Sequence, residues 1–138
     1  MISVILATYN WPQALDLCLQ SLSTQIDLDF EIIIADDGSS NTTKTVIDQH
    51  TPTMPVSMKH LWQEDQGFRK TQILNQAIVA ASGSYLIFLD GDCIVQPDYV
   101  LRHRELAKAD HLVTGSRVLI NEALTKELLT WKSWGFQH

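Results

Sequence analysis

The sequence lacks several features that would place it in a special class of protein. Its longest uninterrupted apolar runs are five residues long, as in 85–89, whereas a membrane-spanning helix needs roughly 18 to 20. Glycine and proline number only 6 and 4, and 45% of the residues are hydrophobic, which excludes a collagen-like or disordered chain. With 138 residues, the chain is predicted to form one globular domain around one core.

Positive charge is also scarce. The 10 Lys and Arg residues face 16 Asp and Glu residues, for a net charge of -6, and no Lys/Arg-rich run is present. A role built on contacts with the DNA or RNA backbone is therefore not expected. A nucleotide ligand is still compatible with this composition, because a bound divalent cation can reverse the local field.

Cysteine is limited to Cys18 and Cys93. Two cysteines are too few for a disulfide framework, and their spacing is not that of a metal site. The sequence also lacks a basic segment followed by an apolar segment of the kind that directs secretion. These observations predict a protein of the reducing cytoplasm.

The hydrophobic pattern predicts alternating strands and helices. Short β-rich apolar runs predict strands at 2–7, 30–35, 56–62 and 84–89, and apolar residues at helical spacing predict helices that start at Pro12 and cover 42–50 and 73–81. Farther along, the pattern predicts a helix at 97–107, a strand at 111–118 with Gly115 inside it, and a helix at 121–131. The aromatic ending, 131–138, suggests a piece of a longer chain.

Polar residues follow three of the predicted strands directly. They are Thr8-Tyr9-Asn10, Asp36-Asp37-Gly38 and Asp90-Gly91-Asp92. Alternation of strand and helix favours an α/β fold with a mostly parallel sheet and helices on both faces. Ligands bind beyond the carboxyl ends of the strands in such sheets, so the three clusters are predicted to meet at one edge.

Asp90 and Asp92 flank a glycine directly after the predicted strand at 84–89. If the extended geometry continues, both carboxylates point to the same side, and two such close carboxylates ionise together only beside a cation. Mg²⁺ or Mn²⁺ accepts one or two carboxylates and completes its shell with phosphate oxygens and water. The motif thus indicates a metal-diphosphate site, although an isolated Asp-Gly-Asp is also typical of a turn that caps the next segment.

Three further residues have both a functional and a structural interpretation. Asp37 is either a ligand-binding carboxylate or a turn former, and Tyr9 is either a stacking platform for a nucleobase or an aromatic residue packed at the rim. Arg69 stands where a helix begins, and a cation there opposes the helix dipole unless an anionic ligand arrives.

Four stretches, taken together, resemble the family 2 glycosyltransferases of GT-A fold. They are 2–10, Asp36-Asp37-Gly38-Ser39, Gly67-Phe68-Arg69 leading to 75–78, and 89–92, and they have the right order and spacing over residues 2–118. Residues 63–70, together with 90–93 and 97–98, are similar to bacterial cell-surface polysaccharide enzymes, including chondroitin-polymerase-like ones. The resemblance implies one nucleotide-sugar-binding domain over 1–138, with the three-layer α/β/α, Rossmann-like architecture of GT-A proteins, truncated before the acceptor site.

The resemblance also implies a role for each matching residue. Thr8 and its neighbours would supply backbone contacts, Tyr9 would stack on the pyrimidine, and Asp37 would accept a hydrogen bond from the base. Arg69 would lie against the base or the diphosphate. Asp90 would bind the ribose hydroxyls and stand beside Asp92, the last acid of the DxD motif, which would coordinate Mn²⁺ or Mg²⁺.

The implied reaction is inverting transfer of a sugar from a nucleotide-diphosphate sugar, UDP-linked by expectation, to a glycan or lipid-linked acceptor. In the family the general base is an Asp or Glu well downstream of DxD. Only 46 residues follow Asp92, and neither Glu122 nor Glu127 is in a recognisable acidic pair. We therefore expect donor binding, with the base missing, in the cytoplasm and at the inner face of the membrane if the acceptor is lipid-linked.

Two alternatives stay open at this point. One is a non-catalytic nucleotide-binding module, which has the same ligand but no turnover. The other is a receiver-type signalling module, which also places acidic pairs after strands. A receiver requires a phosphorylatable Asp after the third strand, whereas the third predicted strand here runs into Leu61-Trp62-Gln63.

Overall fold

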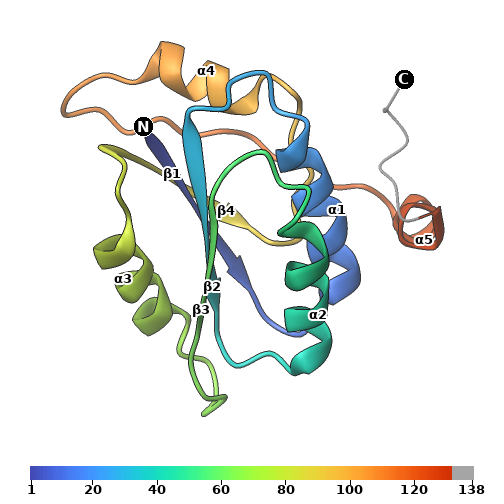
Figure 1. Ribbon diagram of the computed structural model, residues 1–138. Helices are drawn as coiled ribbons and strands as arrows, with labels where there is room; N and C mark the ends of the chain where they lie inside the picture. Colours follow the sequence, from blue (N-terminus) through green and yellow to red (C-terminus); the bar gives the residue numbers. More distant parts are fainter. Residues whose placement is uncertain (132–138) are drawn as a thin grey trace.

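Four parallel strands form the centre of the computed structural model, which describes residues 1–131 (Figure 1). They are β1 (Ile2–Thr8), β2 (Phe30–Asp36), β3 (Met58–Trp62) and β4 (Tyr85–Asp90), in the order β3-β2-β1-β4. The helices are α1 (Pro12–Ser23), α2 (Asn41–His50), α3 (Lys70–Ala80), α4 (Tyr99–Leu106) and α5 (Glu122–Trp131).

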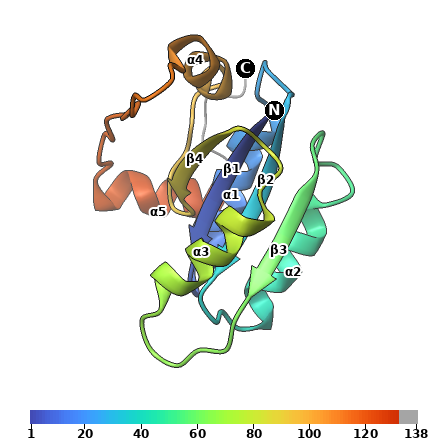
Figure 2. The same cartoon turned by 90° about the vertical axis from the view of Figure 1, so that its left-hand side faces the viewer.

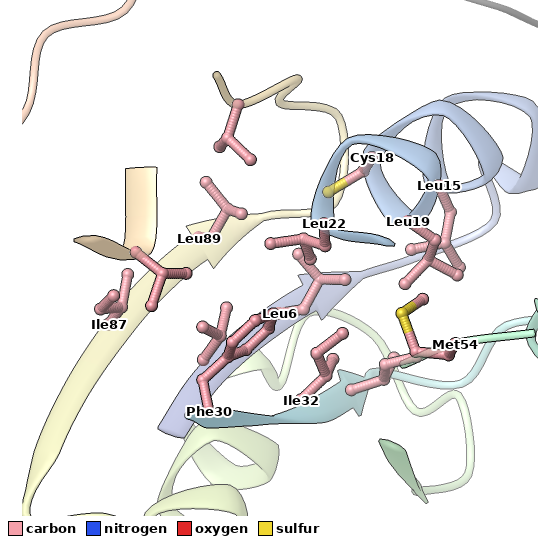
Figure 3. Close-up of a cluster of buried hydrophobic side chains, with 14 of the residues drawn as sticks. Leu6, Leu15, Cys18, Leu19, Leu22, Phe30, Ile32, Met54, Ile87 and Leu89 are labelled. Carbon is pink, nitrogen blue, oxygen red and sulfur yellow. The ribbon is translucent and has the colours of Figure 1, made fainter. Parts of the chain in front are cut away.

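The pleat of the central strands divides the core into two faces. Val4 and Leu6 belong to the larger cluster, which α1 covers with Leu15, Cys18 and Leu19 (Figure 3). Figures 1 and 2 show α1 and α2 on this face of the sheet and α3 on the other. Because both faces are covered, β1 and β2 are apolar and buried on both sides.

The second face is smaller. It joins Ile5 of β1 and Ile33 of β2 to Ile73 and Ala77 of α3. The predicted three-layer α/β architecture is therefore confirmed, and all four strands are parallel.

The register of the strands brings their carboxyl ends level. Ala7 lies opposite Ala35 on one side and opposite Asp90 on the other, and Thr8 lies opposite Asp36. The three polar clusters that follow β1, β2 and β4 consequently leave the sheet at the same edge, as the sequence predicts.

At the opposite end of the sheet, where the strands begin, a buried carboxylate joins neighbouring segments. Glu31, only 4% exposed, accepts hydrogen bonds from the Ser3 hydroxyl and the Ser82 backbone N–H, both at 2.7 Å. Ser3 in turn accepts a hydrogen bond from the Gly83 N–H at 2.8 Å. Burial alone raises the pKa of Glu31, but these hydrogen bonds and the nearby Lys59 outweigh it and hold the pKa below its ordinary value.

The prediction of a strand at 111–118 is wrong. Residues 107–121 form neither helix nor strand, and the side chains of Leu112 and Val118 are 89% and 90% exposed. The β-branched composition that suggested a strand favours one only where neighbouring strands accept its backbone and side chains. No strand of the part of the chain that is described pairs with this segment.

The other predicted elements are present, with ends that shift by at most three residues. The predicted helix at 121–131 corresponds to α5, which packs its Leu128 against Leu17 of α1. The aromatic ending lies, from residue 132 on, outside the described residues. Within residues 1–131, no helix is long and apolar enough to cross a membrane.

Glu31→Gln tests the buried carboxylate at the end of the sheet where the strands begin. A group with a lowered folded-state pKa stabilises the fold above its unfolded pKa, about 4.3 for glutamate, and this contribution disappears as the pH falls through the folded-state pKa. We expect the substitution to lower the free energy of unfolding at pH 7 by about 1 to 3 kcal/mol.

The difference from wild type should shrink as the pH falls from about 5 to about 3, measured by urea unfolding. Glu105→Gln, on the exposed part of α4, is the matched control and should change nothing. A Glu31→Gln deficit that is the same at every pH would contradict a role for the charge.

Candidate functional site

A pocket of about 390 Å³ opens at the edge of the sheet where the polar clusters meet. The carboxyl ends of β1, β2 and β4 form its floor, and the loop between β3 and α3 forms one wall. Its lining residues are Ala7, Thr8, Tyr9, Trp11, Ala35, Asp37, Asp65, Gly67, Phe68, Lys70, Asp90, Gly91 and Asp92.

Asp37 is held in a fixed orientation at the end of β2. One carboxylate oxygen accepts a hydrogen bond from the Gln63 side-chain amide at 2.7 Å, and the other accepts one from the Arg69 backbone N–H at 2.8 Å. Gln63 also donates to the Arg69 carbonyl at 2.9 Å. Each carboxylate oxygen has a second lone pair, so Asp37 can accept a further donor from a molecule in the pocket.

The neighbouring Asp36 has a different task. It is 1% exposed and accepts hydrogen bonds from the His60 ring at 2.9 Å and from the Ser39 backbone N–H at 2.9 Å. Because successive side chains of a strand point to opposite faces, Asp36 braces the turn after β2 while Asp37 lines the pocket.

The loop after β1 is pinned by Asn10. Its backbone is left-handed, with φ 45°, a conformation that asparagine tolerates better than most residues. Its N–H donates to the Ser39 hydroxyl and its side-chain oxygen accepts from the Ser40 N–H, both at 2.8 Å. The loops after β1 and β2 are thereby joined, which fixes the place of Tyr9 at the mouth of the pocket.

Tyr9 is half exposed, and its hydroxyl donates to Asp65 at 2.8 Å. This hydrogen bond, together with the negative charge of Asp65, raises the pKa of Tyr9. The phenol therefore stays neutral, with its ring beside the pocket and its hydroxyl bound to the opposite wall.

The Asp90-Gly91-Asp92 segment is a turn rather than a continued strand. The Cys93 N–H donates to the Asp90 carbonyl at 3.1 Å, and the Gly91 N–H donates to the Ala7 carbonyl at 2.7 Å. A Cβ on Gly91 would lie 2.8 Å from the Ala7 oxygen. The expected extended geometry is thus wrong, because β1 ends so close to Gly91 that the chain turns, yet both carboxylates still line the pocket.

The two carboxylates of this turn differ in their surroundings. Asp90 lies between two cations, with one oxygen 3.0 Å from Lys70 Nζ and the other 3.5 Å from an Arg117 nitrogen. Asp92 is exposed, and its contact is the Cys93 thiol at 3.7 Å. Burial and the charge of Asp92 raise the pKa of that thiol. Within the described range, no three His, Cys, Asp or Glu side chains are placed to hold a metal ion.

Five of the six residues singled out from the sequence therefore surround one pocket. They are Thr8, Tyr9, Asp37, Asp90 and Asp92. Arg69 is held beside it by its side chain, which donates to the Glu64 carbonyl at 2.7 Å and to the Gln72 side chain at 3.1 Å.

Sequence reasoning missed Gln63, Asp65 and Lys70. Gln63 and Asp65 follow β3 directly, so the rule that singled out the other loops could have found them. Lys70 gave only the signal of a second basic residue at the beginning of a helix.

The comparisons with known proteins agree with this geometry. Residues 3–137 match the sequence profile described as Glycosyl transferase family 2. The chain belongs to glycosyltransferase family 2. The predicted resemblance is thereby confirmed.

Curated relatives in this family include validoxylamine A glucosyltransferase of Streptomyces hygroscopicus subsp. jinggangensis, 35% identical over 72% of this chain and 24% of the relative. Chondroitin synthase of Escherichia coli is 28% identical over 72% of this chain and 14% of the relative. The chain spans about a quarter of the length of the validoxylamine A glucosyltransferases that it matches.

Solved structures share the fold. Staphylococcus aureus TarS in complex with UDP has a TM-score of 0.65 at 24% identity, over 75% of this chain and 31% of the TarS chain. Pyrobaculum calidifontis PcManGT in complex with GDP-Man and Mn²⁺ has a TM-score of 0.70 at 22% identity, over 78% of this chain and 32% of the PcManGT chain. The family 2 chain described here therefore has the GT-A fold.

Gly91→Ala tests the close approach of the turn to β1. The added methyl group has no space against the Ala7 carbonyl and must displace the turn, so we expect a loss of about 1 to 3 kcal/mol in the free energy of unfolding. Gly115→Ala is the matched control, since nothing lies within 4 Å of its added Cβ, and urea unfolding should show it unchanged. Equal stability of both variants would refute the steric constraint.

Proposed function

We propose that this chain is the donor-binding part of a glycosyltransferase that transfers a sugar from a UDP-sugar to a glycan or lipid-linked acceptor in cell-surface polysaccharide biosynthesis. The observation that carries the proposal is the pocket in which Tyr9, Asp37, Asp90 and Asp92 meet. Membership of family 2 supports the reaction class. Solved structures of the same fold hold UDP, UDP-GlcNAc or GDP-Man, which supports a nucleotide-sugar as the ligand.

The base-recognising end of the proposed site is Asp37 with Tyr9. Carboxylate oxygens accept hydrogen bonds, so we assign to Asp37 the recognition of a base N–H, such as that of uracil. Its orientation is fixed by Gln63 and by the Arg69 backbone before any ligand binds, which reduces the ordering cost of binding. The exposed ring of Tyr9 offers a stacking surface worth about 1 to 3 kcal/mol for a base.

The Asp90-Gly91-Asp92 turn is proposed to contact the ribose and the diphosphate. We assign the ribose hydroxyls to Asp90 and a divalent cation, Mn²⁺ or Mg²⁺, to Asp92, with the Thr8 backbone at the pocket floor. An exposed carboxylate such as Asp92 fits an ion that takes one or two protein oxygens and completes its shell with phosphate and water. Such an ion supplies charge neutralisation for the departing nucleoside diphosphate.

Asp90 is the weaker metal candidate, because Lys70 and Arg117 already neutralise it. With one free carboxylate and no cluster of three ligands among residues 1–131, the ion should bind together with the nucleotide rather than before it. We assign Arg69, whose backbone N–H supports Asp37, to contact with the base or the diphosphate.

We leave the general base of the inverting reaction unassigned. An inverting transfer needs a group that takes the proton of the attacking hydroxyl. Asp37 and Asp65 are engaged within the pocket wall, and Glu122 and Glu127 lie exposed on α5. The domain over 1–138 is accordingly proposed to bind the donor and to depend on further residues for transfer.

Because no general base is assigned among these residues, we keep a second candidate, a nucleotide-binding module without turnover. It shares the pocket and the ligand and differs only in the missing reaction. For either candidate we propose a cytoplasmic location, at the inner face of the membrane if the acceptor is lipid-linked, which the free thiols of Cys18 and Cys93 support.

Calorimetric titration of UDP into the chain tests the proposal. We expect binding in the presence of Mn²⁺ that weakens at least about tenfold in EDTA, with GDP and ADP binding more weakly. Asp92→Asn should remove the effect of Mn²⁺ and keep the residual binding. Asp48→Asn, exposed on α2, is the matched control. A folded chain that binds none of the three nucleotides would refute the proposed function.

Asp37→Asn tests base recognition separately. The amide oxygen can still accept from the Arg69 N–H, but an amide nitrogen replaces the second acceptor oxygen, so we expect UDP affinity to fall by about tenfold. Affinity for inorganic pyrophosphate with Mn²⁺ should stay the same. An equal loss for UDP and pyrophosphate would show that the residue supports the pocket rather than reads the base.

A further inference from the structure

We propose that Lys70 binds the diphosphate of the nucleotide, and that in doing so it leaves Asp90 free for the ribose. In the structure the two residues pair with each other; with the nucleotide bound, Lys70 would contact the diphosphate and Asp90 the ribose. This inference rests on the proposed function, because it assigns a further residue to the same site.

The position of Lys70 carries the first step. It is the first residue of α3 and lines the pocket, with its ammonium group 3.0 Å from one oxygen of Asp90. The side chain is 38% exposed, so Nζ reaches the pocket without moving the helix. The dipole of α3 opposes a cation at this end, which leaves Lys70 dependent on an anion in front of it.

The charges around the pocket carry the second step. Four carboxylates line it, those of Asp37, Asp65, Asp90 and Asp92, against the single ammonium group of Lys70. A diphosphate that enters such a pocket meets repulsion that one divalent ion at Asp92 offsets only in part. Lys70 is the one Lys or Arg side chain among the described lining residues and supplies the further positive charge.

The exchange of partners carries the third step. When Lys70 turns to the phosphate oxygens, Asp90 still has Arg117, which lies 3.5 Å from one of its oxygens in the structure. Its other oxygen is then free to accept a hydrogen bond from a hydroxyl. The ribose offers two hydroxyl donors. The ligand thus gives both members of the Lys70–Asp90 pair a new partner at once, a phosphate oxygen for Lys70 and a ribose hydroxyl for Asp90.

A purely structural role for the pair predicts something different. Lys70 and Asp90 are 38% and 46% exposed, and ion pairs with such access to water contribute little to stability. We therefore expect Lys70→Met to fold as the wild type does, so that its effect on ligands can be measured directly.

Calorimetry of the full chain with UDP and with uridine, in Mn²⁺, tests the inference. Lys70→Met should weaken UDP by about tenfold or more, the loss expected for a charge-assisted hydrogen bond. Uridine, which has the ribose but no phosphate, should bind within about twofold of wild type. Lys70→Arg should restore most of the UDP affinity. Added salt should lower the affinity for UDP less in Lys70→Met than in wild type.

Lys44→Met is the matched control, since Lys44 pairs with Asp48 on the exposed face of α2, and it should leave both ligands unaffected. Unchanged UDP affinity in Lys70→Met overturns the inference and leaves the proposed function standing. Equal losses for UDP and uridine also overturn it, because Lys70 then acts only by holding Asp90. A wild-type chain that binds neither ligand refutes the proposed function itself.

Discussion

The pairing of β1 with β2 on one side and β4 on the other is the constraint on which the site depends. Ala7 has a partner in each neighbour, Ala35 and Asp90, so three strands end at one level. The loops that follow them have no choice but to share an edge. The pocket exists because parallel strands of matched length all direct their carboxyl ends to the same place.

Once the edge is set, hydrogen bonds between loops determine the positions of the side chains. Asn10 joins the loop after β1 to Ser39 and Ser40, and Gln63 joins the end of β3 to Asp37. Gly38, with φ 94°, allows the Asp65 backbone to approach until an added Cβ would lie 2.6 Å from it. The pocket wall is therefore built from contacts between residues about 30 positions apart.

Much of the fold could be predicted from the sequence, because its main signals are local. The run 30–35 holds three consecutive β-branched isoleucines, which favour a buried strand. Leu15, Cys18, Leu19 and Leu22 repeat at helical spacing and are all fully buried. The place of Asp37 and Asp90 at strand ends followed from the same pattern. These inferences need no knowledge of which segments meet.

The remaining features depend on partners that are distant in sequence. The turn at Gly91 is set by the Ala7 carbonyl, 84 positions before it, and the pair of Lys70 with Asp90 joins residues 20 apart. The segment 111–118 has the composition of a strand but no neighbouring strand among residues 1–131. Composition describes what a segment could do, whereas its partners decide which possibility is realised.

The two edges of the sheet have separate tasks. The amino-terminal edge is sealed by Glu31, Ser3 and Gly83, and the carboxyl-terminal edge carries polar loops whose side chains face the pocket. Substitutions in those loops can alter which molecule is bound while the buried network at the far end keeps the sheet folded. The chain is modular in this sense: the residues that close the sheet at one end and the residues that line the pocket at the other share the same strands but no side-chain contact in these two networks.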